Sequence, residues 1–245
     1  MIRLLNKKYL DNTKKNKGSL LVKNSDMFKR YGLFIAGVIF SALGISLITK
    51  AGLGTSPITS LAFVLTFIFP KSLGVFTMLV NFAMFLLQAV LLGKNFKKIQ
   101  LLQLPAALLF SLCIDVWMYL LSFWQVGNYL GEALMMLSGC VFLGFGISLE
   151  VIPNVLILPG EGLVRVIAGL TGWRFGRVKT GFDLSIVISA VIVSVLVTGS
   201  VLGIREGTVI AALIVGSISH FFIDKVSGLL AGWIPDYTST GDVCL

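Results

Sequence analysis

Long apolar segments separated by short polar ones form the main pattern along this chain. Six of them have about the length, roughly 20 residues, that an α-helix needs to cross the hydrocarbon core of a bilayer. These segments are residues 32–49, 73–93, 101–123, 131–150, 181–202 and 207–232. The pattern therefore predicts an all-α, multi-pass membrane protein.

Two further apolar segments, residues 51–69 and 152–171, are interrupted by glycine and proline. Pro57 in the first and Pro159 in the second suit the first position of a helix, where the missing N–H group is not needed. We expect a short helix to begin at each proline. Irregular backbone at membrane depth is stable only where protein or a water-filled cavity satisfies it. The breaks therefore predict a cavity near the middle of the membrane.

The two halves of the chain repeat each other. The run Gly-Ile-Ser-Leu at 44–47 returns at 146–149, an offset of 102 residues. The same offset pairs Gly37 with Gly139, Phe40 with Phe142, Pro57 with Pro159, Gly74 with Gly176 and Asn81 with Asp183, and after an insertion Ile114 and Asp115 correspond to Ile223 and Asp224. Duplicated hydrophobic halves that are broken at matching places are typical of secondary transporters.

The expected organisation is a basic tail over residues 1–30, a membrane repeat over 31–125, a second repeat over 131–232 and a short tail over 233–245. Each repeat contains three full spans and one short broken helix. That helix is either re-entrant or an additional span.

The distribution of lysine and arginine favours the re-entrant alternative. Nine basic residues lie between the spans, and if the broken segments crossed the membrane, five would lie outside and four inside. If both segments are re-entrant, six lie inside, and only Lys50, Lys71 and Arg205 lie outside. The second distribution follows the positive-inside rule. It also gives the two repeats opposite orientations in the membrane, which is an inverted arrangement.

Composition supports a membrane protein, because 56% of the residues are hydrophobic, 13% are charged and the mean hydropathy is +0.95. A soluble domain of 245 residues cannot hide that much apolar surface. The formal net charge is +9, but nine of the twenty Lys and Arg residues lie within residues 1–30. A basic flank before the first span is retained in the cytoplasm. We therefore expect a bacterial cell membrane protein with both tails cytoplasmic, and lipid rather than nucleic acid as its partner.

The chain lacks the sequence patterns of an enzyme. Cys113, Cys140 and Cys244 have no metal-ligand spacing, and His220 is the only histidine. No nucleophile motif and no nucleotide-binding fingerprint is present. We expect no catalytic residue, no metal site and no cofactor.

Candidate binding residues come from the two breaks and from polar positions inside the spans. Glycine permits a tight turn before a short helix, and Thr or Ser can cap its free amides. Polar groups within a membrane are costly unless they are paired or hydrated. The candidate set is Gly52, Gly54, Thr55, Ser56, Pro57, Asn81, Asp115, Pro159, Gly160, Glu161, Asp183 and Asp224.

The chemistry of these candidates leaves alternatives open. Asp115 and Asp224 occupy equivalent positions and either serve a site or proton relay, or form buried structural hydrogen bonds. Two half-helix N-termini that meet at a cavity would favour an anionic solute. The alternative is a pair of proline-kinked helices packed within the protein.

The segments around the breaks resemble a known family. The first half reads KAGLGTSPITSLAFVL and then GVFTMLVNFAMFLLQ, and the second half reads PGEGLVRVIAGLTGWRFGRVKTGFDLSIVIS. This order is similar to the YczE/YyaS/YitT group of bacterial integral membrane proteins over most of residues 30–232. The matching positions are Gly74, Asn81, Gly176 and Asp183. The resemblance implies a protein of the bacterial cytoplasmic membrane and suggests export of small molecules.

The sequence as a whole favours a secondary transporter or exporter of a small solute, with its site at the membrane midplane between the two repeats. One alternative is a regulatory or scaffold membrane protein that does not transport. Another is the substrate-binding membrane subunit of an energised transporter. The chain has no ATP-binding motif, and its sequence leaves open whether it forms a homo-oligomer.

The two topologies differ in which basic residues face outward. In a cysteine-free background, Lys50→Cys and Lys71→Cys should react with a membrane-impermeant thiol reagent added to intact cells. Lys94→Cys and Arg177→Cys should react only after the membrane is opened. Reaction of Lys94→Cys in intact cells would contradict the inverted arrangement and support eight spans.

Overall fold

The computed structural model describes residues 24–124 and 126–230, which form helices joined by short loops. The long helices are α2 (Asn24–Lys50), α4 (Leu73–Leu92), α5 (Gln103–Leu120), α6 (Tyr129–Val151), α8 (Phe175–Thr198) and α9 (Glu206–Leu230). The shorter helices are α3 (Ser60–Ile68) and α7 (Pro159–Thr171), and the 3-10 turns are η1 (Pro57–Thr59), η2 (Gly93–Asn95), η3 (Lys98–Leu102) and η4 (Leu121–Phe123). The prediction of an all-helical protein is confirmed for the described residues.

Six of the described helices are long and apolar enough to cross a membrane, which confirms the six predicted spans. Helix α8 differs at both ends, because it begins at Phe175 rather than at 181 and ends at Thr198 rather than at 202. The helix accommodates its early basic residues because Lys179 Nζ pairs with Asp183 Oδ1 one turn later, at 2.7 Å. Gly199 then ends the helix with a left-handed backbone, at φ 71°.

The first helix also begins earlier than expected. Helix α2 starts at Asn24, inside the segment predicted as a tail over 1–30. Residues 1–23 of that tail, and the whole tail predicted over 233–245, lie outside the described residues.

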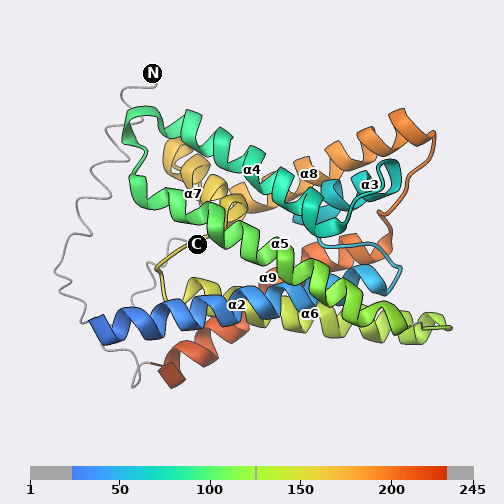
Figure 1. Cartoon of the computed structure of the whole chain (residues 1–245), viewed down its shortest axis with the longest axis horizontal. Coiled ribbons are helices and arrows are strands. Elements are labelled where there is room, and N and C mark those ends of the chain that lie inside the picture. Colours follow the sequence, from blue (N-terminus) through green and yellow to red (C-terminus); the bar gives the residue numbers. More distant parts are fainter. Residues whose placement is uncertain (1–23, 125, 231–245) are drawn as a thin grey trace.

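The long helices run in alternating directions along the chain and form two layers (Figure 1). In one layer α2 packs between α5 and α6, and α6 also contacts α9. In the other layer the short helices connect α4 and α8, because α3 and α7 each contact both of them. In the order of the chain, α3 comes between α2 and α4, and α7 comes between α6 and α8. The two long helices on either side of each short helix run in opposite directions (Figure 1).

Glycines let α2 and α6 approach backbone to backbone. A side chain at Gly44 would collide with the backbone of Leu143, and one at Gly37 would lie 2.8 Å from the carbonyl oxygen of Gly146. The facing residue numbers fall along α6 as they rise along α2, so the two helices are antiparallel. Small residues at such crossings are typical of helices packed within membranes.

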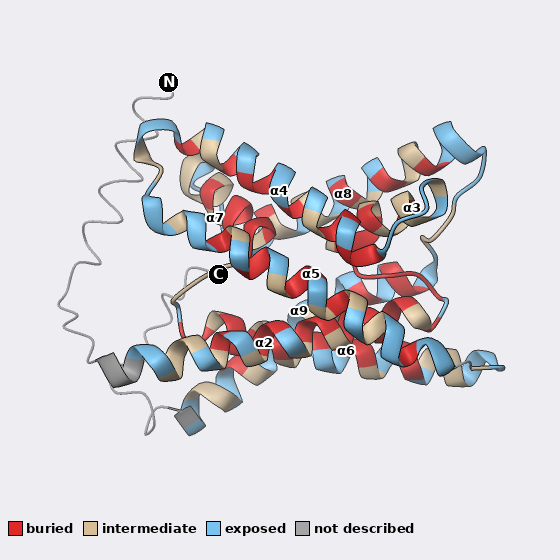
Figure 2. Cartoon of the chain, in the orientation of Figure 1, coloured by how far each residue is buried: buried red, intermediate tan, exposed pale blue. Residues whose placement is uncertain are grey.

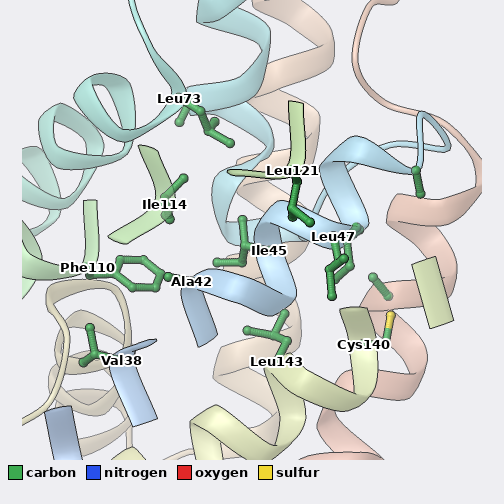
Figure 3. Close-up of a cluster of buried hydrophobic side chains, with 14 of the residues drawn as sticks. Val38, Ala42, Ile45, Leu47, Leu73, Phe110, Ile114, Leu121, Cys140 and Leu143 are labelled. Atoms are coloured by element: carbon green, nitrogen blue, oxygen red, sulfur yellow. The ribbon is translucent and has the colours of Figure 1, made fainter. Parts of the chain in front are cut away.

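The hydrophobic core surrounds this glycine seam. Figure 3 shows part of it, with side chains from α2, α5 and α6 packed together: Val38, Ala42, Ile45, Phe110, Ile114, Cys140 and Leu143. Buried positions are concentrated on α2 and α6, whereas α8 and α9 are more exposed (Figure 2). Large apolar side chains such as Leu79, Leu112 and Leu196 cover the exterior. An apolar exterior of this kind suits contact with lipid chains.

Candidate functional site

Side-chain hydroxyl groups and the first residues of α9 supply hydrogen-bond partners for the first broken segment. A chain of hydroxyl hydrogen bonds, 2.7–3.0 Å long, joins Thr49, Thr55, Thr59 and Ser56. The Thr55 N–H donates to Thr208 Oγ1 at 3.1 Å, and the Gly207 N–H donates to the Leu53 carbonyl at 2.8 Å. This buried irregular backbone is stable because the protein supplies its hydrogen-bond partners.

The second broken segment leads into α7 through a left-handed residue, Asn154, at φ 47°. Helix α7 begins at Pro159 without a side-chain cap, and Glu161 lies in its first turn. A carboxylate at this position complements the positive end of the helix dipole. A Cβ atom added at Gly160 would lie 2.5 Å from Ile58 Cδ1 in η1. The starts of the two short helices therefore meet inside the bundle.

A cavity of about 510 Å³ lies beside this meeting point. Its lining comes from both halves of the chain, namely α2, η1, α4 and α5 from the first half and α6, α7, α8 and α9 from the second. Most lining residues are apolar, and the polar ones are Ser41, Ser56, Thr59, Thr77, Asn81, Glu150, Glu161, Arg165, Lys179, Thr180, Asp183, Thr208, Ser219 and His220. Pockets that bind small molecules have this size and this mixture of lining groups.

The most buried carboxyl group at the cavity belongs to Glu150, near the end of α6. Its side chain is 4% exposed, and Ser41 Oγ on α2 donates a hydrogen bond of 2.6 Å to its Oε1. Neither of the ion pairs Lys179–Asp183 and Arg205–Glu206 includes it. Sequence reasoning missed Glu150, because it ends a predicted span, where an acid ordinarily faces water. A second signal was available, since an acid in the last turn opposes the helix dipole.

Other charged groups line the cavity from α7 and α8. Glu161 and Arg165 lie one turn apart on α7, and Lys179 and Asp183 form the ion pair on α8. Asn81 on α4, which corresponds to Asp183 in the sequence repeat, donates to the Thr77 carbonyl of its own helix at 2.9 Å. The lining therefore has three carboxyl groups against one arginine, one lysine and one histidine.

The structure brings half of the predicted residues to the cavity. Those on its wall are Ser56, Pro57, Asn81, Gly160, Glu161 and Asp183. Those away from the wall are Gly52, Gly54, Thr55, Asp115, Pro159 and Asp224. Gly54 packs against α9, because a side chain there would collide with Thr208. Gly52 and Thr55 belong to the irregular segment before η1, and Pro159 is the first residue of α7.

Asp115 holds the end of α5 against the start of α4. Its carboxylate accepts hydrogen bonds from Ser72 Oγ at 2.6 Å and from the Gly74 N–H at 2.7 Å, and so ties α5 to the first turn of α4. The corresponding residue Asp224 is exposed. The position that corresponds to Gly74, Gly176, has open space around it and lines the cavity.

The difference between the Asp115 and Asp224 environments extends along the helices that carry them, α5 and α9, and their neighbours α4 and α8. Helix α4 packs along α5, whereas the cavity separates the facing surfaces of α8 and α9. Ala107 and Ser111 on α5 are buried, while the corresponding residues on α9, Gly216 and His220, are exposed and line the cavity. The α4–α5 pair is therefore closed, whereas the α8–α9 pair, its counterpart in the predicted repeat, is splayed.

Comparison with known proteins identifies the family. The model of a family of unknown function, DUF6198, matches residues 28–224. The chain belongs to this family. It is 26% identical to the uncharacterized membrane protein YczE of Bacillus subtilis (strain 168) over 206 residues, which cover 84% of this chain and 90% of that protein.

The uncharacterized protein YyaS of the same organism is 24% identical over 198 residues, covering 80% of this chain and 94% of that protein. The resemblance to YczE and YyaS expected from the sequence is therefore confirmed. No solved structure matches the chain. The DUF6198 chain described here is thus a multi-pass membrane protein with bacterial relatives.

The two equivalent aspartates should differ in their effect on stability. Asp115→Asn replaces an acceptor of two hydrogen bonds, one of them to a buried glycine amide. It should lower the free energy of unfolding by about 1–3 kcal/mol, the usual cost of disrupting such a bond. The matched change Asp224→Asn should leave the melting temperature of the purified protein close to that of the wild type. Equal melting of the two variants would contradict the capping role of Asp115.

Proposed function

We propose that the protein is a secondary transporter that moves a small solute by exchanging the states of two inverted repeats. Corresponding elements begin at the same offset of 102 residues, η1 and α7 at Pro57 and Pro159, and α4 and α8 at Leu73 and Phe175. Gly52 and its counterpart Asn154 both have a left-handed backbone. These correspondences support a duplicated architecture.

The α2–α6 crossing supports the inverted orientation of the repeats. Gly37 faces Gly146, and Gly44 faces Gly139. The offset exchanges these two contacts, since Gly37 corresponds to Gly139 and Gly44 to Gly146. Two antiparallel helices with exchangeable contacts are related by a two-fold axis perpendicular to them. Such an axis lies in the membrane plane when the helices span the bilayer.

The observation that carries the proposal is the cavity with one closed and one splayed helix pair. In an inverted pair of repeats, the α4–α5 contact and the α8–α9 gap lie at opposite ends of the solute pathway. If the first half took the splayed form of the second, and the second closed, the same cavity would open to the other side. Rigid movement of repeats around a fixed midplane site is the usual mechanism of such transporters.

In this proposal, the basic N-terminal tail decides which end of the helix bundle faces the cytoplasm. A cytoplasmic tail places the start of α2 and the end of α9 on the cytoplasmic side. The α8–α9 gap then faces the cytoplasm, and the Asp115 contact closes the outer end. In the opposite state, Asp224 would accept a hydrogen bond from the Gly176 N–H, as Asp115 does from Gly74. A scaffold protein has no need of a cavity of this size, with charged side chains on its wall, between its halves.

Accessibility of matched cysteines tests this exchange. In a cysteine-free background, Gly216→Cys on α9 should react quickly with a membrane-impermeant reagent in inside-out vesicles. Ala107→Cys, its counterpart on α5, is fully buried in this state and should react slowly from the outside of intact cells, whenever the opposite state forms. Ala42→Cys, buried in the glycine seam, is the control and should react from neither side.

Labelling of Gly216→Cys alone would mean a pocket open to one side and would contradict transport. Labelling of neither residue would mean a packed interior and would support the scaffold alternative.

A further inference from the structure

We infer that the cavity binds a lipophilic organic cation, with the carboxyl group of Glu150 as its counter-ion. This inference rests on the proposed function for its biological use, but the binding site itself is argued from the chemistry of the cavity wall. The first observation is the charge balance. With His220 counted as neutral, Glu150, Glu161 and Asp183 face the cavity against Arg165 and Lys179. One carboxyl group is therefore in excess whatever Arg165 contacts.

Glu150 is the carboxyl group that best fits the role of counter-ion. Lys179 is paired with Asp183 at 2.7 Å, whereas the hydrogen-bond partner of Glu150 is the neutral Ser41 hydroxyl. A carboxylate that is 4% exposed is costly inside a membrane unless a cation or a proton neutralises it. Glu161 lies close enough to interact electrostatically with Glu150. This second acid strengthens the negative potential at the site.

A second, independent observation points to a bound ligand. Thr77 on α4 lines the cavity, and its residue is 3% exposed. Its Oγ1 atom is buried and has no hydrogen-bond partner. Buried hydroxyl groups without partners are uncommon in folded proteins, because the lost hydrogen bond is not replaced. A protonated amine in the cavity would supply this partner if the Thr77 side chain turned toward it.

The walls select the chemical class of the cation. They are mostly apolar and include Met84 on α4, Phe110 on α5 and Phe175 on α8. Aromatic faces and the methionine thioether attract cationic and apolar groups alike. Among the described residues, no group of three or more His, Cys, Asp or Glu side chains could hold a metal ion. An organic cation with apolar substituents fits these walls better than a metal ion.

The anion that the helix N-termini would favour fits less well. The first turn of α7 already contains Glu161, which complements the helix dipole. The Thr55 N–H, just before η1, is already occupied by its hydrogen bond to Thr208. An anion at the meeting point of the helices would therefore lie beside Glu150 and Glu161.

Two probes of the same shape and opposite charge test the inference. Purified full-length protein should bind tetraphenylphosphonium in equilibrium dialysis and should not bind tetraphenylborate. Glu150→Gln should weaken tetraphenylphosphonium binding by about tenfold or more, the factor that corresponds to about 1.4 kcal/mol. Glu150→Asp keeps the charge and should retain most of the binding. Glu132→Gln, at the opposite end of α6 and away from the cavity, should bind as the wild type does.

Competition with protons separates Glu150 from its neighbours. Tetraphenylphosphonium binding by the wild type should weaken as the pH falls, because a proton and the cation compete for the carboxylate. In Glu150→Gln this pH dependence should be much smaller, although Glu161, Asp183 and His220 still face the cavity. A Glu161→Gln variant should keep most of the wild-type dependence.

Equal or tighter binding of tetraphenylborate by the wild type would overturn the inference, and this comparison needs no variant to fold. Unchanged tetraphenylphosphonium binding in Glu150→Gln would overturn it as well. Failure of both probes to bind, with Ala107→Cys still labelled from outside, would reject the cation site and leave the transport proposal intact. Cation binding at Glu150 without labelling of Ala107→Cys would keep the site and reject transport.

Discussion

The close approach of α2 and α6 is the constraint on which the rest of this membrane protein depends. Within a bilayer, apolar surface alone does not drive helices together, so close packing and hydrogen bonds must do so. The four glycines at the crossing remove the side chains that would separate the two backbones. The same crossing brings Ser41 against Glu150 and so holds a carboxyl group at the cavity. At the offset of 102 residues, Ser41 corresponds to Leu143 and Glu150 corresponds to Ile48, and both of these counterparts are apolar.

The broken segments satisfy a second requirement, the hydrogen bonding of irregular backbone. The first break uses threonine and serine hydroxyls and the start of α9, whereas the second uses a left-handed asparagine and leaves α7 without a side-chain cap. Both breaks place a helix start beside the cavity. In the proposed transport cycle, the closed α4–α5 pair and the splayed α8–α9 pair decide from which side the cavity is accessible. In this account, stability comes from the seam and access comes from the outer helix pairs.

Local patterns in the sequence predicted the spans, the helix starts at Pro57 and Pro159, and the resemblance to YczE and YyaS, because each depends on hydrophobic runs or short motifs. The different environments of Asp115 and Asp224 could not be predicted. The two residues occupy equivalent sequence positions, and only the packing of α4 against α5 separates a cap from an exposed side chain. Glu150 was missed for a similar reason. Its burial depends on α2, which lies more than 100 residues away in the chain.

The most direct test of the central claim, that the two halves exchange closed and splayed states, is a pair of distance measurements by double electron–electron resonance in proteoliposomes. Spin labels at the exposed positions Ser185 and Ser217 report the α8–α9 separation, and labels at the corresponding exposed positions Ala83 and Leu108 report the α4–α5 separation. The account predicts two populations for each pair, with the fraction of short α8–α9 distances equal to the fraction of long α4–α5 distances. A single distance for each pair, with α8 and α9 always apart, would contradict it.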